Sequence, residues 1–176
     1  GFGFERILLP DTLGVLNPFE TEAYISETVK RFPELRFEFH AHNDYDLAVA
    51  NVMAAVKAGV RGIHTTVNGL GERAGNAPLS SVAAVLNDHL KVRNAIVEKN
   101  INHVSRLVET YTGIHIPANE PVVGENVFTQ CAGIHADGDN KSHLYYNDLL
   151  PERFGRVREY ALGKTSGKAN IKKNLE

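Results

Sequence analysis

The chain has 176 residues, of which 43% are hydrophobic and 23% charged, a composition typical of a folded domain rather than a disordered or collagen-like one. Nineteen basic against 21 acidic side chains give a formal charge of −2, so we expect no nucleic-acid or membrane partner, since both need a basic surface. No apolar run approaches the roughly 20 residues of a membrane helix. The single cysteine, Cys131, excludes an intrachain disulfide and favours a reducing, cytoplasmic location.

The first part of the chain alternates predicted strands and helices. Strands are predicted over 4–9, 35–40 and 61–67, and helices over 17–32, 46–58 and 78–90. Asn17 is a typical N-cap, and Gly59 is a typical residue at a helix end. Successive strands begin about 25 to 31 residues apart, the length of one βα unit, which predicts a parallel sheet.

The second part, after about residue 95, has no strand signal. Apolar residues at helical spacing predict a helix from Ile101 that ends at Gly113, and a second helix is predicted over 127–134. We therefore expect an α/β domain over 1–95 and a mainly helical one over 96–176. The three βα units fit an open doubly wound sheet or a section of a (β/α)8 barrel, which needs around 250 residues when complete.

Two histidines, His40 and His42, end the second predicted strand. Strand side chains alternate between faces, so these two point the same way, about 6 to 7 Å apart. Two imidazoles at that spacing can share one divalent cation, and strand ends are where sheet and barrel enzymes place their sites. The alternative is a pair of hydrogen-bonded or solvent-facing histidines. Asn43 and Asp44 follow and can orient ligands or cap the next helix.

The glycine-rich segment 68–76 lies between the third strand and its helix. It is one residue longer than the dinucleotide-binding pattern GxGxxG, and no acidic residue follows at the expected distance. The alternative is a tight loop that returns Asn76 to the strand ends, with Glu72 and Arg73 forming a local ion pair.

Three weaker signals occur elsewhere in the chain. The segment 163–168 lacks the spacing of a phosphate-binding loop. Cys131 and His135 lie four residues apart on a predicted helix, and a packed cysteine is favoured over a thiol–imidazole pair. His64, on the third strand, is predicted to be structural.

Several motifs together resemble the 2-isopropylmalate, citramalate and homocitrate synthases. They are His-Ala-His-Asn-Asp at 40–44, Leu-Ala-Val-Ala-Asn at 47–51, Asn-Gly-Leu-Gly-Glu-Arg-Ala-Gly-Asn at 68–76, Leu-Pro-Asp-Thr at 9–12 and the stretch 127–138. These are metal-dependent barrel enzymes that condense acetyl-CoA with a 2-oxo acid. The resemblance implies a partial (β/α)8 barrel, its last three βα units, followed by a small, mainly helical linker subdomain. Related lyases share the two histidines but carry a cysteine-containing loop in place of residues 71–76, which favours a synthase.

Carried over by position, the resemblance implies roles for six residues. His40, His42 and Asn76 would help hold a divalent metal (Mn, Mg or Zn), and Thr12 would bind the carboxylate of the 2-oxo acid. His135 and Tyr145 would be catalytic residues that reach into the active site of the partner subunit, which implies a homodimer. The acetyl-CoA methyl would lose a proton, the enolate would attack the ketone, and thioester hydrolysis would free CoA.

The resemblance favours a 2-isopropylmalate or citramalate synthase of leucine or isoleucine biosynthesis, acting on 2-oxoisovalerate or pyruvate. Asp46 stands where many isopropylmalate synthases have glycine, which is the more citramalate-like feature. The chain begins just before the sixth barrel strand of the family, so the other strands are expected on a longer chain and this part alone to be inactive. Two other functions remain open: a nucleotide-binding oxidoreductase that uses the 69–75 loop, and a non-catalytic assembly module.

Overall fold

The computed structural model describes residues 3–131, 138, 146–164 and 166–175. The chain divides into two compact units, Gly1–Ala95 and Ile96–Glu176, which we call unit 1 and unit 2 and describe separately.

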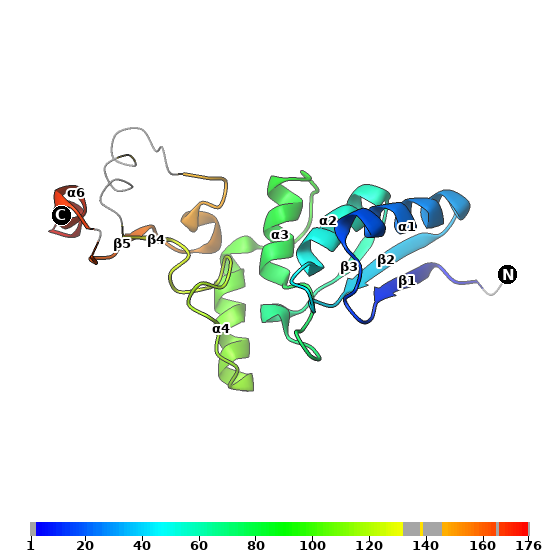
Figure 1. The fold of residues 1–176 in the computed structure, drawn as a ribbon, viewed down its shortest axis with the longest axis horizontal. Coiled ribbons are helices and arrows are strands. Elements are labelled where there is room, and N and C mark those ends of the chain that lie inside the picture. Colours follow the sequence, from blue (N-terminus) through cyan, green and yellow to red (C-terminus); the bar gives the residue numbers. More distant parts are fainter. Residues whose placement is uncertain (1–2, 132–137, 139–145, 165, 176) are drawn as a thin grey trace. The chain divides into compact units, whose positions relative to one another are not determined.

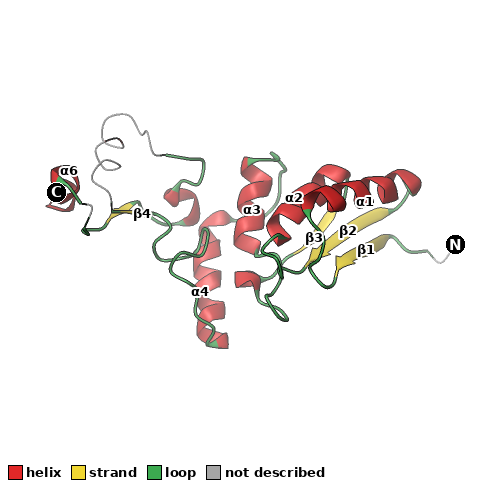
Figure 2. Ribbon diagram, in the orientation of Figure 1, coloured by secondary structure: helices red, strands yellow, loops and turns green. Residues whose placement is uncertain are grey.

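Unit 1 is a parallel three-stranded sheet whose strands are connected along the chain by helices (Figures 1 and 2). The order in the sheet is β1-β2-β3, with Pro10 opposite His40 and His40 opposite His64. The strands are β1 Arg6–Asp11, β2 Arg36–Ala41 and β3 Gly62–His64. The helices are α1 Pro18–Arg31, α2 Ala48–Ala58 and α3 Leu79–Asp88, with a 3-10 turn, η1 Val67–Gly69, after β3. The predicted parallel α/β arrangement is therefore confirmed.

The two faces of the sheet differ because strand side chains alternate. On β2, Phe37 and Phe39 are buried against the helices, where they meet Ile25 of α1 and Val52 of α2. Each large apolar side chain buried there contributes about 1.5–3 kcal/mol to folding. The intervening residues of β2, among them His40, point to the opposite face. The core of unit 1 thus fixes where the polar strand residues point.

The helix ends of unit 1 follow the capping signals in the sequence. The Asn17 side chain accepts hydrogen bonds from the backbone N–H groups of Phe19 and Glu20, and the Glu20 side chain accepts one from Asn17 N, a complete capping box. α2 ends at Gly59, whose φ of 111° lies in the left-handed region.

The third strand is shorter than predicted. Its predicted continuation turns away from the sheet at Thr66, which exchanges backbone hydrogen bonds with Ala77 and Leu79 instead (3.2 and 2.9 Å). The segment just after the glycine-rich loop therefore pairs with Thr66 in place of another strand.

Unit 2 contains one long helix and several short elements. They are η2 Glu98–Asn100, α4 Ile101–Thr112, β4 Thr129–Gln130, η3 Pro151–Phe154, β5 Glu159–Tyr160 and α6 Lys168–Leu175. The predicted helix 101–113 is confirmed, and it ends at Gly113 with φ of 69°. The helix predicted over 127–134 is wrong for its described residues, because Thr129–Gln130 is a strand paired in parallel with β5. The expectation that this part has no strands is wrong for the same reason.

The core of unit 2 is a small cluster tied together by arginines. Phe128 stacks on Phe154 with ring centroids 6.1 Å apart, and Phe154 is fully buried. Arg153 donates two hydrogen bonds to the Glu98 carboxylate (2.7 and 2.9 Å), and Arg156 donates to the carbonyl oxygens of Gly124 and Glu125. Side chains far apart in sequence therefore hold the loops of this unit.

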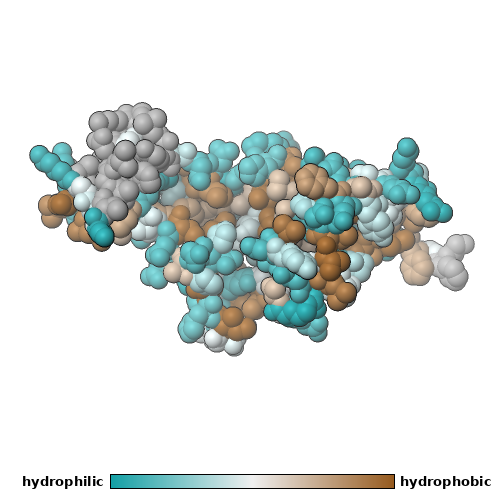
Figure 3. Space-filling model, in the orientation of Figure 1, coloured by the Kyte–Doolittle hydropathy of each residue, from teal (hydrophilic) through white to brown (hydrophobic). Residues whose placement is uncertain are grey.

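Within the described residues, no helix is both long and apolar enough to cross a membrane. The face drawn in Figure 3 carries polar and apolar side chains together.

Candidate functional site

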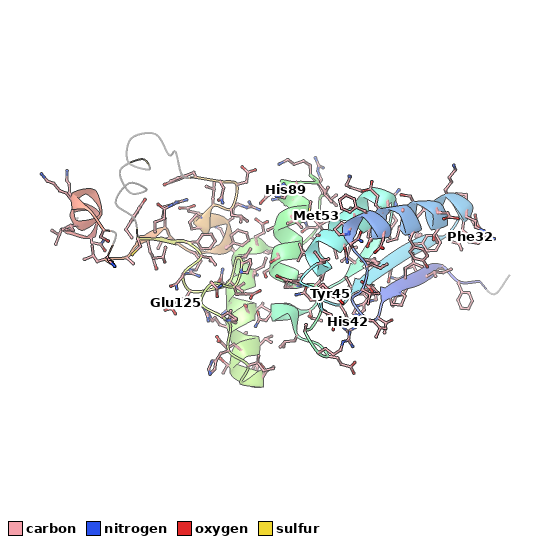
Figure 4. All side chains as sticks on the ribbon, viewed as in Figure 1. Phe32, His42, Tyr45, Met53, His89 and Glu125 are labelled. Atoms are coloured by element: carbon pink, nitrogen blue, oxygen red, sulfur yellow. The ribbon has the colours of Figure 1, made fainter. Side chains whose placement is uncertain are left out.

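The two histidines predicted as metal ligands lie at the carboxyl end of β2, on the face of the sheet turned away from the helices. The rings of His40 and His42 are perpendicular, with centroids 5.0 Å apart. Figure 4 shows His42 and Tyr45 at this end of unit 1, whereas Phe32 lies at the opposite end.

Asn76 is brought beside these histidines by the backbone. Residues His42 and Asn76 form an isolated antiparallel bridge, flanked by hydrogen bonds from Asn43 N to Gly75 O (2.9 Å) and from Ala77 N to Ala41 O (3.1 Å). The sequence alternative in which the glycine-rich loop returns Asn76 to the strand ends is therefore confirmed.

The glycines of this loop make room for the Asn76 side chain. Asn76 N donates to Gly69 O (2.9 Å), and its Nδ2 donates to Leu70 O (3.0 Å), which leaves Oδ1 facing away from that carbonyl. A Cβ on Gly71 would lie 2.3 Å from Asn76 Nδ2, and one on Gly75, where φ is 84°, would lie 1.9 Å from Gly69 O. The loop's hydrogen-bonding groups thus serve its own closure.

The three side chains that converge here each keep a buried polar atom without a partner. These atoms are His40 Nδ1, His42 Nδ1 and Asn76 Oδ1, and among the described residues none of them has a hydrogen bond. Other buried atoms in the same condition include Asn51 Oδ1 and the hydroxyls of Thr66 and Ser80. Because leaving such atoms unpaired is unfavourable, the cluster is suited to an added ligand.

The surroundings of His40 favour its neutral form. Burial lowers its pKa, and the neighbouring imidazoles of His42 and His64 lower it further. A neutral imidazole has a free lone pair, which is the form that binds a cation. Within the described ranges, no group of three or more His, Cys, Asp or Glu side chains is arranged to hold a metal, so these residues supply two imidazoles and an amide.

A third imidazole, His64 of β3, lies beside this pair. Its ring centroid is 5.8 Å from that of His40, and its Nε2 lies 2.9 Å from Glu38 Oε2. Glu38 also accepts a hydrogen bond from Arg6 (3.1 Å), and its contact with His64 contributes most to lowering its pKa. His64 thus contacts a carboxylate and a predicted metal ligand.

Thr12, the predicted carboxylate-binding residue, follows directly on β1. Asp11 is opposite Ala41, so Thr12 and His42 occupy matching positions at the ends of neighbouring strands. The Asp11 side chain is buried and accepts from the backbone N–H groups of Val15 and Leu16, which shapes the loop that begins at Thr12. Thr12 itself is exposed.

The predicted Glu72–Arg73 ion pair is present but long, at 3.8 Å, and Arg73 has a stronger partner that the sequence did not indicate. Arg73 Nε and Nη2 donate to the two carboxylate oxygens of Asp44 at 2.7 and 3.0 Å. This contact lowers the pKa of Asp44 and raises that of Arg73. The two residues are 29 positions apart, so no spacing rule links them.

Two further contacts hold the loops around the site. The Asn43 side chain accepts a hydrogen bond from Ala48 N at the start of α2 (3.1 Å), as predicted for a capping role. Asn51 is buried in α2, and its Nδ2 donates to Leu16 O at 2.7 Å. An asparagine within an otherwise apolar helix face was the available signal for this second contact.

The two predicted catalytic residues of the second part, His135 and Tyr145, lie outside the described residues. Cys131 is described, is exposed and is not in a helix, so the favoured packed cysteine is wrong, and the predicted helix is wrong at this residue.

Comparison with known families matches both parts of the chain. The family model described as HMGL-like matches residues 1–108, and the model described as homocitrate synthase post-HMGL domain-like matches residues 122–176. Curated relatives include proteins named homocitrate synthase from Sulfolobus acidocaldarius (43% identical over 174 residues) and Sulfurisphaera tokodaii (42% identical). The alignments cover 99% of this chain but only 37% and 38% of those proteins, so the chain spans less than half their length.

The fold of the chain is similar to that of solved HMG-CoA lyases. A Bacillus subtilis HMG-CoA lyase superposes with a TM-score of 0.60 at 24% identity, covering 66% of this chain and 41% of the lyase. An Acinetobacter baumannii HMG-CoA lyase, solved with coenzyme A and 3-methylmalate, superposes with a TM-score of 0.58 at 25% identity, covering 65% of this chain and 39% of that one.

Proposed function

The chain belongs to the HMGL-like family, and on this premise we propose that it forms part of an acetyl-CoA-dependent enzyme that condenses acetyl-CoA with a 2-oxo acid. Unit 1 would be the last three βα units of a (β/α)8 barrel, and unit 2 the linker subdomain that follows it. The likeness of the fold to HMG-CoA lyases and the post-barrel family match support this division. The other strands of the barrel would lie on a longer chain.

One observation supports the proposal most strongly. His40 and His42 have ring centroids 5.0 Å apart, Asn76 forms a backbone bridge with His42, and each of the three side chains keeps an unpartnered, ligand-capable atom. Two imidazole nitrogens and one amide oxygen suit a divalent cation such as Mn²⁺, Mg²⁺ or Zn²⁺. When bound, the cation would supply the Lewis acid that polarises the ketone of the 2-oxo acid.

The residues of this chain would prepare that site in three ways. Burial lowers the pKa of His40 and so favours the neutral imidazole that can bind a cation. The Leu70 carbonyl oxygen accepts from Asn76 Nδ2, which leaves the Asn76 Oδ1 unpartnered and free to bind a cation. The Thr12 hydroxyl, at the neighbouring strand end, would donate to the carboxylate of the 2-oxo acid. His135 and Tyr145 would act in the site of the partner subunit of a homodimer.

The overall reaction is a carbon–carbon bond formation followed by hydrolysis. The methyl group of acetyl-CoA loses a proton, the resulting enolate attacks the ketone carbon, and the ketone oxygen becomes a hydroxyl. Water then cleaves the thioester and releases CoA. Such chemistry needs fixed positive charge where the new alkoxide develops, which is what rigid strand ends can hold in place.

The names of the relatives indicate which oxo acid to expect. The curated relatives cited above are called homocitrate synthases, and a product of that structure requires 2-oxoglutarate as the acceptor. We therefore propose 2-oxoglutarate ahead of the 2-oxoisovalerate and pyruvate favoured by the sequence motifs. The names of these two relatives do not point to leucine or isoleucine biosynthesis.

The two other functions receive less support. A nucleotide-binding role would use free backbone N–H groups in the glycine-rich loop, but those of Gly69, Gly75 and Asn76 donate within unit 1. A purely structural assembly module gives no reason for three unpartnered ligand atoms to meet.

The test uses a complete enzyme, made by placing this chain in the Sulfolobus acidocaldarius relative instead of its matching 174 residues. We call this protein the reconstituted enzyme. CoA release from acetyl-CoA is measured with 2-oxoglutarate, 2-oxoisovalerate and pyruvate. We expect turnover that requires a divalent cation and is fastest with 2-oxoglutarate.

Two results would change this proposal. Faster turnover with 2-oxoisovalerate or pyruvate would restore the 2-isopropylmalate or citramalate assignment. A folded reconstituted enzyme that releases no CoA with any of the three acids, beside an active parent enzyme, would contradict the condensing function.

A further inference from the structure

Arg73 joins the three loops that follow the three strands of unit 1. Its Nε and Nη2 hold the Asp44 carboxylate in the loop after β2, as described above. Its Nη2 also donates to the backbone carbonyl oxygen of Thr12, in the loop after β1, at 2.8 Å. Arg73 itself belongs to the loop after β3. One guanidinium therefore makes three hydrogen bonds across loops that are distant in sequence.

The backbone around this contact is shaped to allow it. Arg73 has a φ of 57°, and Gly14, in the first loop, has a φ of 61°. A Cβ on Gly14 would lie 2.6 Å from Asp44 Oδ2 and 3.0 Å from Asp44 N, so only glycine leaves space for the carboxylate that Arg73 binds. A left-handed backbone is unfavourable for a residue with a side chain, and the three hydrogen bonds of Arg73 offset that cost.

Each joined loop carries or adjoins one residue of the proposed site. Thr12 is itself an attachment point, His42 lies two residues before Asp44, and Asn76 lies three residues after Arg73. Each site residue is therefore at most three positions along the chain from a residue of this hydrogen-bond network, so we expect a shift of the guanidinium to move the site side chains. Misplacing a binding group by about 1 Å can lower a rate by about 100-fold.

We propose that Arg73 is a positioning residue that sets the spacing between Thr12 and the pair formed by His42 and Asn76. Resting on the proposed function, this inference concerns the distance between the carboxylate-binding hydroxyl and the metal-binding residues. Arg73 contacts neither reactant in this account. Its planar fork suits the role, because a lysine keeps the charge but makes none of these paired contacts in the same geometry.

The test compares Arg73→Lys with the parent in the reconstituted enzyme. We expect the KM for the 2-oxo acid and the Mn²⁺ concentration for half-maximal activity each to rise about tenfold or more, while the KM for acetyl-CoA stays within about twofold. Asp44→Asn weakens the hydrogen bonds between Arg73 and residue 44 but leaves the one to Thr12. It should raise the same two constants by a smaller factor. The double variant should be little worse than Arg73→Lys alone.

The matched control is Lys57→Gln, which removes an exposed ion pair with Glu22 (3.6 Å) between α1 and α2, away from the strand ends. It should change none of these constants. If Arg73→Lys lowers only the fraction of active enzyme and leaves both the KM for the oxo acid and the Mn²⁺ response unchanged, the positioning role is wrong. Should Arg73→Lys fail to fold, Asp44→Asn decides by the same criterion.

A second comparison separates this inference from the proposed function. If the reconstituted enzyme releases no CoA while its parent enzyme is active, the proposed function itself fails, and if His40→Ala retains full metal-dependent turnover, only the metal-binding role of His40 fails. Suppose instead that His40→Ala loses turnover, but neither Arg73→Lys nor Asp44→Asn alters the KM for the 2-oxo acid or the Mn²⁺ response. Then only the role of Arg73 is overturned.

Discussion

The two units of the chain hold their loops in different ways. In unit 1, the strand ends are fixed by a parallel ladder whose buried face packs against three helices, and the site side chains stand on the other face. In unit 2, loops enclose a small core. Arg156 holds them by donating hydrogen bonds to backbone carbonyl oxygens, and Arg153 by donating to the Glu98 carboxylate. The comparison indicates that unit 1 owes its geometry to its backbone and core, and unit 2 to a few long polar contacts.

The largest effects should come from emptying each core. Phe39→Ala and Phe154→Ala each remove a buried ring, which costs about 3–5 kcal/mol of folding free energy. Phe39 immediately precedes His40, so only Phe39→Ala should also weaken Mn²⁺ binding. Denaturant unfolding and Mn²⁺ titration of the reconstituted enzyme measure both quantities. Equal loss of Mn²⁺ binding in both variants would show that the units are not independent in this respect.

A smaller effect is expected from Arg153→Met. Both side chains of the Arg153–Glu98 pair are about four-fifths buried (19% and 20% exposed), so its removal leaves a partly buried carboxylate unpaired, at about 1–3 kcal/mol. Hydrogen exchange should increase at the amides of Glu159 and Ala161, which link β4 and β5. The amides of β2 should keep their protection. Faster exchange in β2 as well would contradict the separate anchoring of unit 2.

The Asp44–Arg73 contact gives a dependence on pH. Its formation lowers the pKa of Asp44 below the ordinary value of 3.8, so the folded state binds fewer protons than the unfolded state near that pH. The stabilisation is complete above the ordinary value and is lost as the pH falls through the folded value. The stability difference between the parent and Asp44→Asn should therefore be constant from about pH 5 to 8 and shrink below about pH 4. A difference that grows on acidification would contradict this assignment.

The smallest effect is expected at Asp46. Its φ of 59° lies in the left-handed region, which favours glycine over a residue with a side chain. Asp46→Gly relieves that strain but loses the hydrogen bond from Asn43 Nδ2 (3.2 Å) and loosens the unfolded chain. The free energy of unfolding, measured by thermal denaturation, should change by less than about 0.5 kcal/mol in Asp46→Gly. In Asp46→Val it should fall by more than about 1 kcal/mol, the penalty of a strained residue.

Local signals predicted most of unit 1 because there they agree with the packing. Alternation along β2, the capping box at Asn17 and the Gly59 end each reflect the same core, so strands and helices were found with only their ends shifted. The approach of Asn76 to His42 was one of two alternatives, because a loop's path is decided by contacts such as that of Asn76 with Leu70. The Arg73–Asp44 contact could not be predicted from periodicity.

Unit 2 was predicted less well for a physical reason. The helix from Ile101 has a periodic apolar face and was found. Thr129 and Gln130 form a short segment with apolar residues before and after it in the sequence. Periodicity cannot distinguish a helix from a strand over so few residues without the knowledge that β5 pairs with it. Its partner is 30 residues away in sequence.

In the proposed enzyme, His40, His42 and Asn76 jointly hold a divalent cation. Mn²⁺ binding to the reconstituted enzyme, measured by titration calorimetry, tests it most directly, with His89→Ala as the control because His89 is an exposed residue after α3. We predict one Mn²⁺ per chain in the parent and in His89→Ala, and at least about tenfold weaker binding in His40→Ala, His42→Ala and Asn76→Ala. Unchanged Mn²⁺ affinity in all three of these variants would contradict the account.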